Sequence, residues 1–301
     1  MESTRRYTIS IAIPVSCLNE ANNLQLKSAL VYQIARLAIV YEVDEIVLVA
    51  DPEHVRQTQN ATASSDCYVR DPLKFFSDIL SYMETPTFMR KTIFPLLPHL
   101  KHMGLFPVIQ LRNDSSQILD KDFPYKEAYV LNQLPRSKNK YVVHAGFQHP
   151  VQVTSTQPLA AKDRLTVRLK PQAPNTEGYL QGDIVSCTAP REKGGRYWGF
   201  QIRHSTSLSD LLKGPYKGGY DLKVQINNST HVSPADLSNN LRSSFRHVLL
   251  LFGNAFENQP VDDLHTVNPF PFPLPIQPRL EENFLAAMAP LSIVLNSHGR
   301  H

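Results

Sequence analysis

Apolar residues in the first fifty positions follow two different periods. Tyr7–Val15 is a short apolar run rich in β-branched residues, which predicts a buried strand. Leu24–Val40 carries its apolar residues every three or four positions, which predicts a helix, with Asn22 or Asn23 as its N-cap. Val43–Val49 is a second short apolar run. Strand, helix and strand in this order predict a β-α-β unit and a parallel sheet.

The pattern changes in the middle of the chain. Asp71–Tyr82 and Thr85–Leu97 are predicted as helices, and the polar stretch Glu53–Ser65 as a loop. From about Tyr125 the helical period gives way to short strand-like runs separated by turn-rich pieces. Five such runs predict a small barrel of the OB type. They are Ala128–Leu134, Tyr141–Phe147, Leu165–Lys170, Asp183–Cys187 and Tyr197–His204.

The last third returns to an α/β pattern. Gly219–Ile226 and Phe245–Phe252 are predicted as buried strands, with a helix over Pro234–Ser243 between them. Asn268–Pro278 contains five prolines, so it is predicted to be a stiff extended loop before a helix that begins at Arg279. Loops between a strand end and a helix start are where α/β proteins bind ligands.

Composition excludes several classes of protein. Hydrophobic residues make up 42% of the 301 residues and charged residues 19%, which is typical of a packed globular chain. The net charge of +4 permits a nucleic-acid partner without demanding one. We expect no membrane span, because no run of 18 apolar residues occurs, and no signal peptide. The scattered histidines and three separate cysteines predict no metal site.

Several stretches, in order, resemble the SPOUT (SpoU/TrmD) class of RNA methyltransferases, and more closely its eukaryotic and archaeal branch with an inserted barrel. Gln33-Ile-Ala-Arg36, followed by Val43-Asp-Glu-Ile-Val47, is similar to the first-helix arginine and second strand of that branch. Thr85-Pro-Thr-Phe-Met-Arg-Lys91, followed by Phe94-Pro95, is similar to another segment. Further similar stretches are Tyr197-Trp-Gly199, Gly219-Tyr-Asp-Leu222 and Phe245-Arg-His-Val248.

The resemblance implies a trefoil-knotted α/β domain made of residues 1–111 and 206–301. Residues 112–205 would form an inserted OB-like barrel that holds RNA. S-adenosylmethionine would lie in three loops of the knot, and the active site would be shared across a homodimer. We expect the dimer to form through the helix after Arg279, whose apolar side chains Phe284, Leu285, Met288 and Leu291 have no other evident cover in the sequence. A nuclear or nucleolar protein, or a cytoplasmic one, is expected.

The resemblance also implies residue roles. Arg36 is the candidate catalytic residue, near the cofactor or target base; the alternative is an arginine that pairs with Asp44 or Glu45. The candidate cofactor-binding residues follow predicted strands or begin the last helix. They are Phe252, Gly253, Asn254, Asn268, Pro271, Phe272, Pro273, Arg279, Leu280 and Glu281. A tight turn at Gly253 and a helix-dipole role for Glu281 are the simpler explanations.

Basic residues supply the candidate RNA contacts. Arg90 and Lys91 could bind phosphate or form an ordinary basic surface pair, with equal weight for each. Lys193 and Arg196 lie beside Tyr197 and Trp198, a combination that suits phosphate contact and base stacking. Trp198 itself is predicted to be a core residue.

The candidate cofactor loops depart from the family pattern. Gln225–Thr230 has no glycine, Asn254 stands where a second glycine is usual, and Phe272–Pro278 replaces a glycine-rich knot loop. Since glycine allows close approach to the backbone and proline removes N–H donors, we expect weak or absent affinity for S-adenosylmethionine. The expected function is methylation of RNA, on a ribosomal RNA uridine by analogy. The alternatives are a catalytically silent RNA-binding or ribosome-assembly factor and, less favoured, a protein-interaction scaffold.

Overall fold

The chain folds into two compact units. The first comprises residues 1–81, 98–107 and 199–301, and the second residues 82–97 and 108–198. The computed structural model describes residues 7–50, 69, 71–109, 123–135, 137, 139–171, 174–175, 178–228, 232–234, 236–237, 244–253, 256, 261–270 and 274–298.

A six-stranded parallel sheet forms the centre of the first unit, in the order β11-β9-β10-β1-β2-β8. Every residue of β1 is buried, as are four of the five residues of β9 and all of β2. Burial on both faces explains why these strands are continuous apolar runs in the sequence. The strands are β1 (Thr8–Pro14), β2 (Glu45–Val49), β8 (Gln201–Ser205), β9 (Leu222–Ile226), β10 (His247–Phe252) and β11 (Leu264–Val267).

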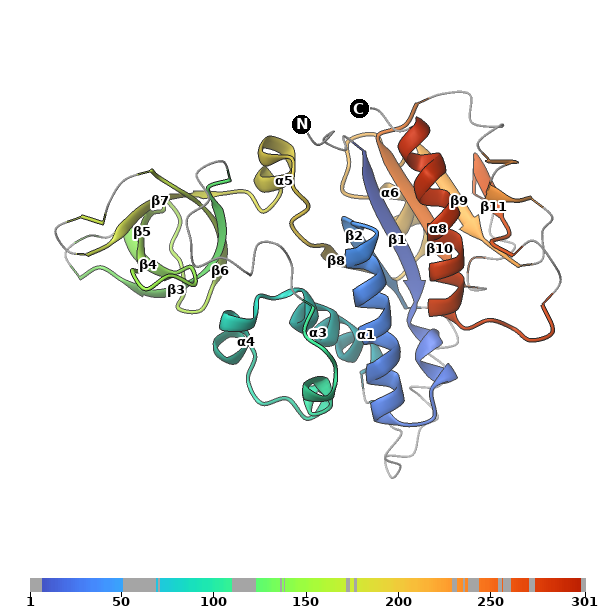
Figure 1. Ribbon diagram of the computed structural model, residues 1–301, viewed down its shortest axis with the longest axis horizontal. Coiled ribbons are helices and arrows are strands. Elements are labelled where there is room, and N and C mark those ends of the chain that lie inside the picture. The colour runs from blue at the N-terminus through green and yellow to red at the C-terminus, as the bar shows by residue number, and fades with distance from the viewer. Residues whose placement is uncertain are drawn as a thin grey trace. The chain divides into compact units, whose positions relative to one another are not determined.

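Helices cover both faces of this sheet (Figure 1). On one face α1 (Leu24–Val40) packs against α8 (Leu280–His298), and Phe284 of α8 contacts Phe252 of β10 at 5.0 Å between ring centroids. On the other face α6 (Leu208–Lys213) buries Leu211. The short helices η1 (Val15–Glu20), η2 (Pro98–Leu100) and η3 (Met103–Leu105) also belong here, and the unit boundary falls within α3 (Pro72–Glu84).

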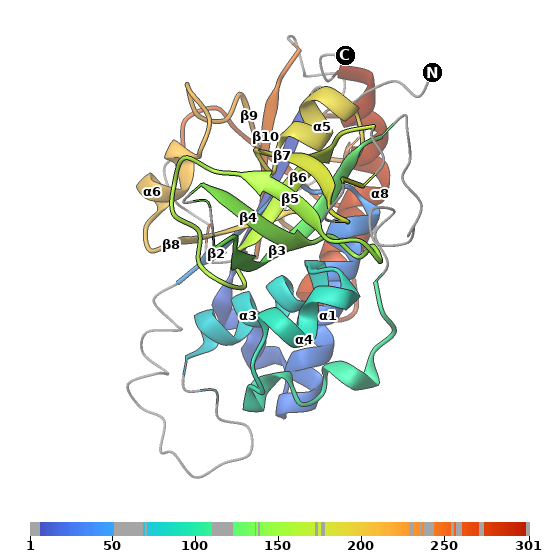
Figure 2. The same cartoon turned by 90° about the vertical axis from the view of Figure 1, so that its left-hand side faces the viewer.

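The second unit contains a closed five-stranded barrel in the order β3-β4-β5-β7-β6 (Figure 2). Its core is built from small and β-branched residues such as Ala128, Val130, Val143, Val151 and Val167. The strands are β3 (Tyr125–Gln133), β4 (Lys140–His144), β5 (Val151–Thr154), β6 (Arg164–Leu169) and β7 (Leu180–Val185). The helices α4 (Thr87–Ile93) and α5 (Ala189–Gly194) belong to the same unit.

One predicted barrel strand and the predicted extent of the barrel unit are wrong. The predicted strand Tyr197–His204 is β8, which pairs with β2 in the parallel sheet, with Gln201 opposite Glu45. The fifth barrel strand is instead β5, a run of only four residues that was not predicted. The second unit therefore ends at Trp198 rather than at residue 205, and it includes residues 82–97, which were assigned to the other domain.

The apolar face predicted for the last helix is also covered within the chain. Phe284, Met288 and Leu291 are each 0% exposed, because α8 packs on β10 and α1. Leu285 and Ile293 are the large apolar side chains that α8 leaves exposed among the described residues. The argument for a homodimer from an uncovered face of Phe284, Met288 and Leu291 therefore fails.

Candidate cofactor edge and nucleic-acid surface

Three strand ends define the candidate cofactor edge of the parallel sheet. β9, β10 and β11 are parallel neighbours, so the residues after them lie along the same edge. Asn268, which follows β11, donates from its side-chain amide to the Asn228 carbonyl after β9, at 3.2 Å. Its side-chain oxygen accepts from the Phe270 N–H at 2.9 Å. Asn268 therefore holds two of the loops together by hydrogen bonds of its own.

Gly253, directly after β10, has a positive φ of 95°. A Cβ placed there would lie 2.8 Å from Cγ of Pro14, the last residue of β1. The conformation and the close approach of Pro14 both require glycine at this position. Packing between two neighbouring strand ends is thus a sufficient reason for Gly253.

The first turn of α8 meets the same region of the unit. The N–H of Arg279 donates to Glu282 Oε2 at 2.8 Å, so Glu282 caps the helix start. Two candidate cofactor-binding residues, Leu280 and Phe252 at the end of β10, are buried, so their side chains pack in the core. Arg279 is exposed and lies 3.2 Å from Glu281 Oε1 and 3.3 Å from Glu282 Oε1.

Glu281 is the unusual residue of this turn. It is only 5% exposed, and neither carboxylate oxygen accepts a hydrogen bond from a described residue. Nearby, burial raises the pKa of Glu20 above its ordinary value; the Leu280 N–H opposes that shift, and the negative charge of Glu281 adds to it. The Arg279 guanidinium supplies a positive charge 3.2 Å away but no hydrogen bond, so this carboxylate can still accept N–H groups from a positively charged ligand.

Arg36 does not join this edge within one chain. It is exposed on α1, and the two suggested acidic partners bond elsewhere: Asp44 accepts from the Ile9 N–H, and Glu45 pairs with Arg203. α1 begins at the carboxyl edge of the sheet and ends near the start of β2. Since a helix rises 1.5 Å per residue, Arg36 lies about 18 Å along the axis from Leu24. Arg36 is therefore far from the candidate cofactor residues that the structure describes in the same chain.

Four candidate cofactor residues, Asn254, Pro271, Phe272 and Pro273, lie outside the described residues. Among the residues described, no three His, Cys, Asp or Glu side chains are grouped so that they could hold a metal ion. None of the helices in that part of the chain is long and apolar enough to cross a membrane.

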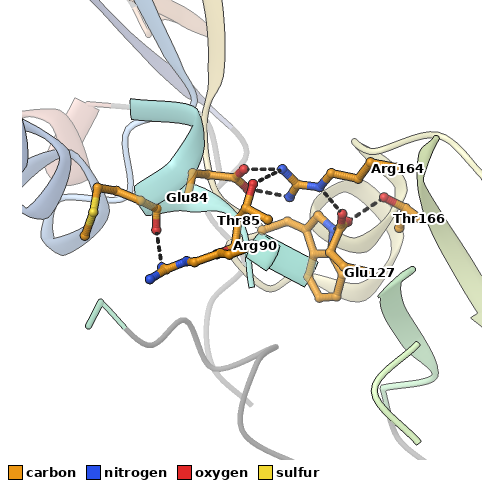
Figure 3. A network of polar contacts seen from close by, with 8 residues as sticks. Glu84, Thr85, Arg90, Glu127, Arg164 and Thr166 are labelled. Atoms are coloured by element: carbon orange, nitrogen blue, oxygen red, sulfur yellow. Dashed lines mark hydrogen bonds and ion pairs between the residues drawn. The ribbon is translucent and has the colours of Figure 1, made fainter. Parts of the chain in front are cut away.

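A buried polar network lies on the outer face of the barrel (Figure 3). Arg164 of β6 donates to both carboxylates of Glu84 and Glu127, through Nη2 to Glu84 Oε1 at 2.9 Å and through Nε to Glu127 Oε2 at 2.6 Å. Glu127 Oε1 also accepts from Thr166 at 2.7 Å and from the indole N–H of Trp198 at 2.6 Å. Trp198 is 6% exposed, so the prediction that it is a core residue is confirmed.

Arg90, for which a phosphate contact and a basic surface pair were predicted with equal weight, is a buried side chain. It is 8% exposed and donates to two carbonyls at the end of α3, from Nε to Thr85 O at 2.8 Å and from Nη2 to Met83 O at 3.1 Å. Its guanidinium also lies 4.8 Å from the Tyr82 ring centroid. Arg90 is therefore occupied in closing the α3–α4 turn, whereas its neighbour Lys91 is exposed.

Lys193 and Arg196 are both exposed around α5, so their predicted contact with RNA is open to them. Arg196 stacks over Phe123, with its Cζ 4.4 Å from the ring centroid. Phe123, Tyr125, Ala189 and Trp198 form a small apolar cluster under this part of the unit. Arg196, two residues after the end of α5, is thus held on a packed aromatic base.

Charge is divided unequally between the two units. Residues 82–97 and 108–198 contain 15 Lys and Arg against nine Asp and Glu, a net charge of +6. The remaining residues contain 16 Lys and Arg against 18 Asp and Glu, a net charge of −2. The barrel unit therefore carries the entire positive excess of the chain, as a nucleic-acid surface requires.

Sequence reasoning missed the Glu84–Arg164–Glu127 network and the buried carboxylate of Glu281. Alternation along β3 offered only a weak signal, because Glu127 lies on the face opposite the core residues Ala128 and Val130, where a solvated carboxylate is the usual expectation. No local pattern could identify Glu84, whose partner Arg164 is 80 residues away.

Comparison with known proteins agrees with this architecture. A family model described as "putative RNA methyltransferase" matches residues 8–262. A putative methyltransferase of Schizosaccharomyces pombe is 51% identical over 99% of this chain and 96% of its own length. The 28S rRNA (uridine-N(3))-methyltransferases of Homo sapiens and Drosophila melanogaster are each 30% identical, over 83% and 94% of this chain. The alignments span 64% of the human relative and 61% of the fly relative. The chain belongs to the RNA methyltransferase family that this model describes.

Proposed function

We propose that the protein methylates a uridine of large-subunit ribosomal RNA, with S-adenosylmethionine as the methyl donor. The observation that carries this proposal is the family match over residues 8–262, together with relatives named 28S rRNA (uridine-N(3))-methyltransferase. Such a substrate would place the protein in the nucleus or nucleolus, or in the cytoplasm.

The carboxyl edge of the parallel sheet is the proposed cofactor site. Its backbone after β9, β10 and β11, including Asn268 and Gly253, would form the walls, in a trefoil knot of the SPOUT class. S-adenosylmethionine supplies an electrophilic methyl group when bound. Glu281 fits such a ligand, because its buried carboxylate accepts no hydrogen bond from a described residue, and the ammonium group of the cofactor would join Arg279, 3.2 Å away, as a second cation.

Arg36 is the proposed catalytic residue, and it would act in a second copy of the chain. Within one chain it is about 18 Å along α1 from the start of that helix, so it cannot serve the edge that holds Glu281. A homodimer, with Leu285 and Ile293 of α8 as exposed apolar contacts, would bring Arg36 of one protomer to the cofactor edge of its partner. Its guanidinium would favour the uracil anion that forms when the ring nitrogen loses its proton.

A methylation assay tests the proposal. Full-length protein is incubated with S-adenosylmethionine and unmodified large-subunit rRNA transcribed in vitro, and the digested nucleosides are analysed by mass spectrometry. We expect 3-methyluridine. No methylated uridine, combined with no heat of binding for S-adenosylhomocysteine at millimolar concentration, would support the catalytically silent RNA-binding alternative, which the departures in the cofactor loops favour.

A variant of Glu281 tests the cofactor site directly. Glu281→Gln should weaken the binding of S-adenosylhomocysteine, measured by calorimetry, by roughly 10-fold, because a charge-assisted hydrogen bond is lost. Methylthioadenosine, which lacks the ammonium, should bind both proteins equally. Glu282→Gln is the matched control, since Glu282 caps the helix and is exposed. Equal weakening of both ligands would assign Glu281 a structural role instead.

A further inference from the structure

A cluster of three aromatic rings lies on the outer face of the barrel, beside the Arg164 network. Tyr129 of β3 stands opposite His144 of β4, and their ring centroids are 5.5 Å apart. Phe88 of α4 closes the cluster, at 5.5 Å from His144 and 6.5 Å from Tyr129. The ring of Phe88 also meets Gly146, where an added Cβ would contact it at 3.4 Å.

The place of this cluster follows from the alternation along β3. Ala128 and Val130 point into the barrel core, so Tyr125, Glu127 and Tyr129 point outward. Tyr125 is covered by Phe123 and Trp198, and Glu127 by its hydrogen-bond partners. Burial decreases at Tyr129. All three rings of the cluster are only partly buried, and Leu131, at the bulge after Val130, is 42% exposed.

Basic side chains flank the exposed rings. Lys91 is exposed and stands three residues after Phe88 on α4, so the two share a helix face. Lys162 is exposed in the turn before β6, and its N–H bonds to the Val130 carbonyl at 2.8 Å. Partial burial lowers the pKa of His144, so its ring is uncharged at neutral pH. Partly exposed aromatic rings beside lysines match the chemistry of an unpaired base and its phosphates.

We propose that Phe88, Tyr129 and His144, flanked by Lys91 and Lys162, form a stacking site for an unpaired base of the RNA. The proposal rests on the proposed function for the identity of its ligand as RNA, and it assigns to the barrel a second RNA contact, distinct from Lys193 and Arg196. Stacking accepts any base, so this site would hold the strand, and the sequence would be selected elsewhere.

The test separates stacking from charge. A single-stranded RNA oligonucleotide carrying one 2-aminopurine is titrated with protein between 50 and 200 mM salt, a range in which phosphate contacts change affinity strongly. Tyr129→Val should weaken binding by roughly 10-fold and reduce the quenching of 2-aminopurine, with the salt dependence unchanged. Lys91→Gln should reduce the slope of log affinity against log salt by about 0.7.

Matched controls make the result decisive. Tyr179→Val removes a partly buried tyrosine elsewhere on the barrel and should bind RNA like the parent protein. Phe88→Leu, which keeps an apolar side chain on α4, is the second variant if Tyr129→Val does not fold. Equal binding by the parent, Phe88→Leu and folded Tyr129→Val proteins would overturn the proposal, as would equal losses in Tyr129→Val and Tyr179→Val. If the parent protein binds RNA but does not methylate it, that result contradicts the proposed function and leaves the stacking site standing.

Discussion

At the scale of single residues, Arg164 is the cation that pairs with two buried carboxylates in the barrel unit. Burial raises the pKa of Glu84, and the charge and hydrogen bonds of Arg164 oppose that shift. Burial would also lower the pKa of Arg164, but the carboxylates of Glu84 and Glu127 raise it above its ordinary value. Each charge is acceptable in the interior only because the others are present.

Replacing this arginine should therefore destabilise the protein. Arg164→Met leaves two buried carboxylates without their cation, at a cost of about 3–5 kcal/mol in the free energy of unfolding. The pKa of Glu84, already raised by burial, should rise further, and a raised carboxyl pKa in the folded state means that stability falls as the pH rises through it. Denaturant melts should thus show a smaller deficit at pH 5 than at pH 8. Arg168→Met, on the exposed face of the same strand, should change little at either pH.

The residue roles show where sequence reasoning reaches its limit. Trp198 was predicted correctly as core, because its size and apolar neighbours decide its place. Arg90 and Lys91 are adjacent and equally basic, yet one is buried and the other exposed. The difference depends on the carbonyls of Met83 and Thr85, which become acceptors only once α3 has ended. No pattern of residue types contains that information.

At the scale of elements, the junction between α3 and α4 is closed by side chains rather than by a glycine. Helices commonly end at a glycine in a left-handed conformation, but Thr85 and Pro86 follow α3 here. The guanidinium of Arg90 satisfies carbonyls that the end of the helix leaves without partners. Two consecutive residues of α4 thus divide their work, since Arg90 holds the turn and Lys91 faces solvent.

Alanine substitutions at these two positions should separate stability from RNA binding. Arg90→Ala should lower the free energy of unfolding by about 2 kcal/mol, because buried carbonyls lose their donors. The folded fraction should bind single-stranded RNA as the parent protein does. Lys91→Ala should leave the melting temperature unchanged and weaken the binding of RNA. The reverse pattern, with RNA affinity lost in Arg90→Ala alone at full stability, would restore Arg90 as a direct contact.

Elements with a strong local period were predicted well, and short strands were not. The helix Leu24–Val40 agrees with α1, and of the two predicted N-caps, Asn22 and Asn23, the side chain of Asn23 accepts from the Leu26 N–H at 2.8 Å. β5 and β11, of four residues each, were missed because so short a run has no measurable period. β8 was assigned to the barrel because alternation shows that a strand exists without showing which sheet it joins.

At the scale of the whole molecule, the two units differ in charge as well as in architecture. The barrel unit has a net charge of +6, and the unit with the parallel sheet has −2. A polyanion is therefore attracted to one unit and weakly repelled by the other. The modest total of +4 hides this division, so overall composition understated the case for an RNA partner.

Charge reversal in α5 and directly after it should reveal this division. Lys193→Glu combined with Arg196→Glu should weaken RNA binding and reduce its salt slope by up to about 1.4, at about 0.7 for each lost phosphate contact on a single strand. Filter binding between 50 and 200 mM salt measures this slope. Reversal of Lys217 and Lys223, two lysines of the other unit, should have a smaller effect. An unchanged slope in the α5 variant would move the phosphate contacts to Lys91 and Lys162.

The order of the strands has a consequence for how the chain acquires its structure on the ribosome. β1 lies at the centre of its sheet and pairs with β10, with Thr8 opposite His247. The N-terminal strand thus leaves the exit tunnel long before its partner has been translated. The barrel needs only residues within the middle of the chain, and three of its antiparallel pairs, β3–β4, β4–β5 and β6–β7, join strands that follow one another in sequence. We expect the barrel to fold first in the nascent chain. Until β10 is translated, β1 and β2 expose an unpaired hydrogen-bonding edge, which makes them targets for chaperones.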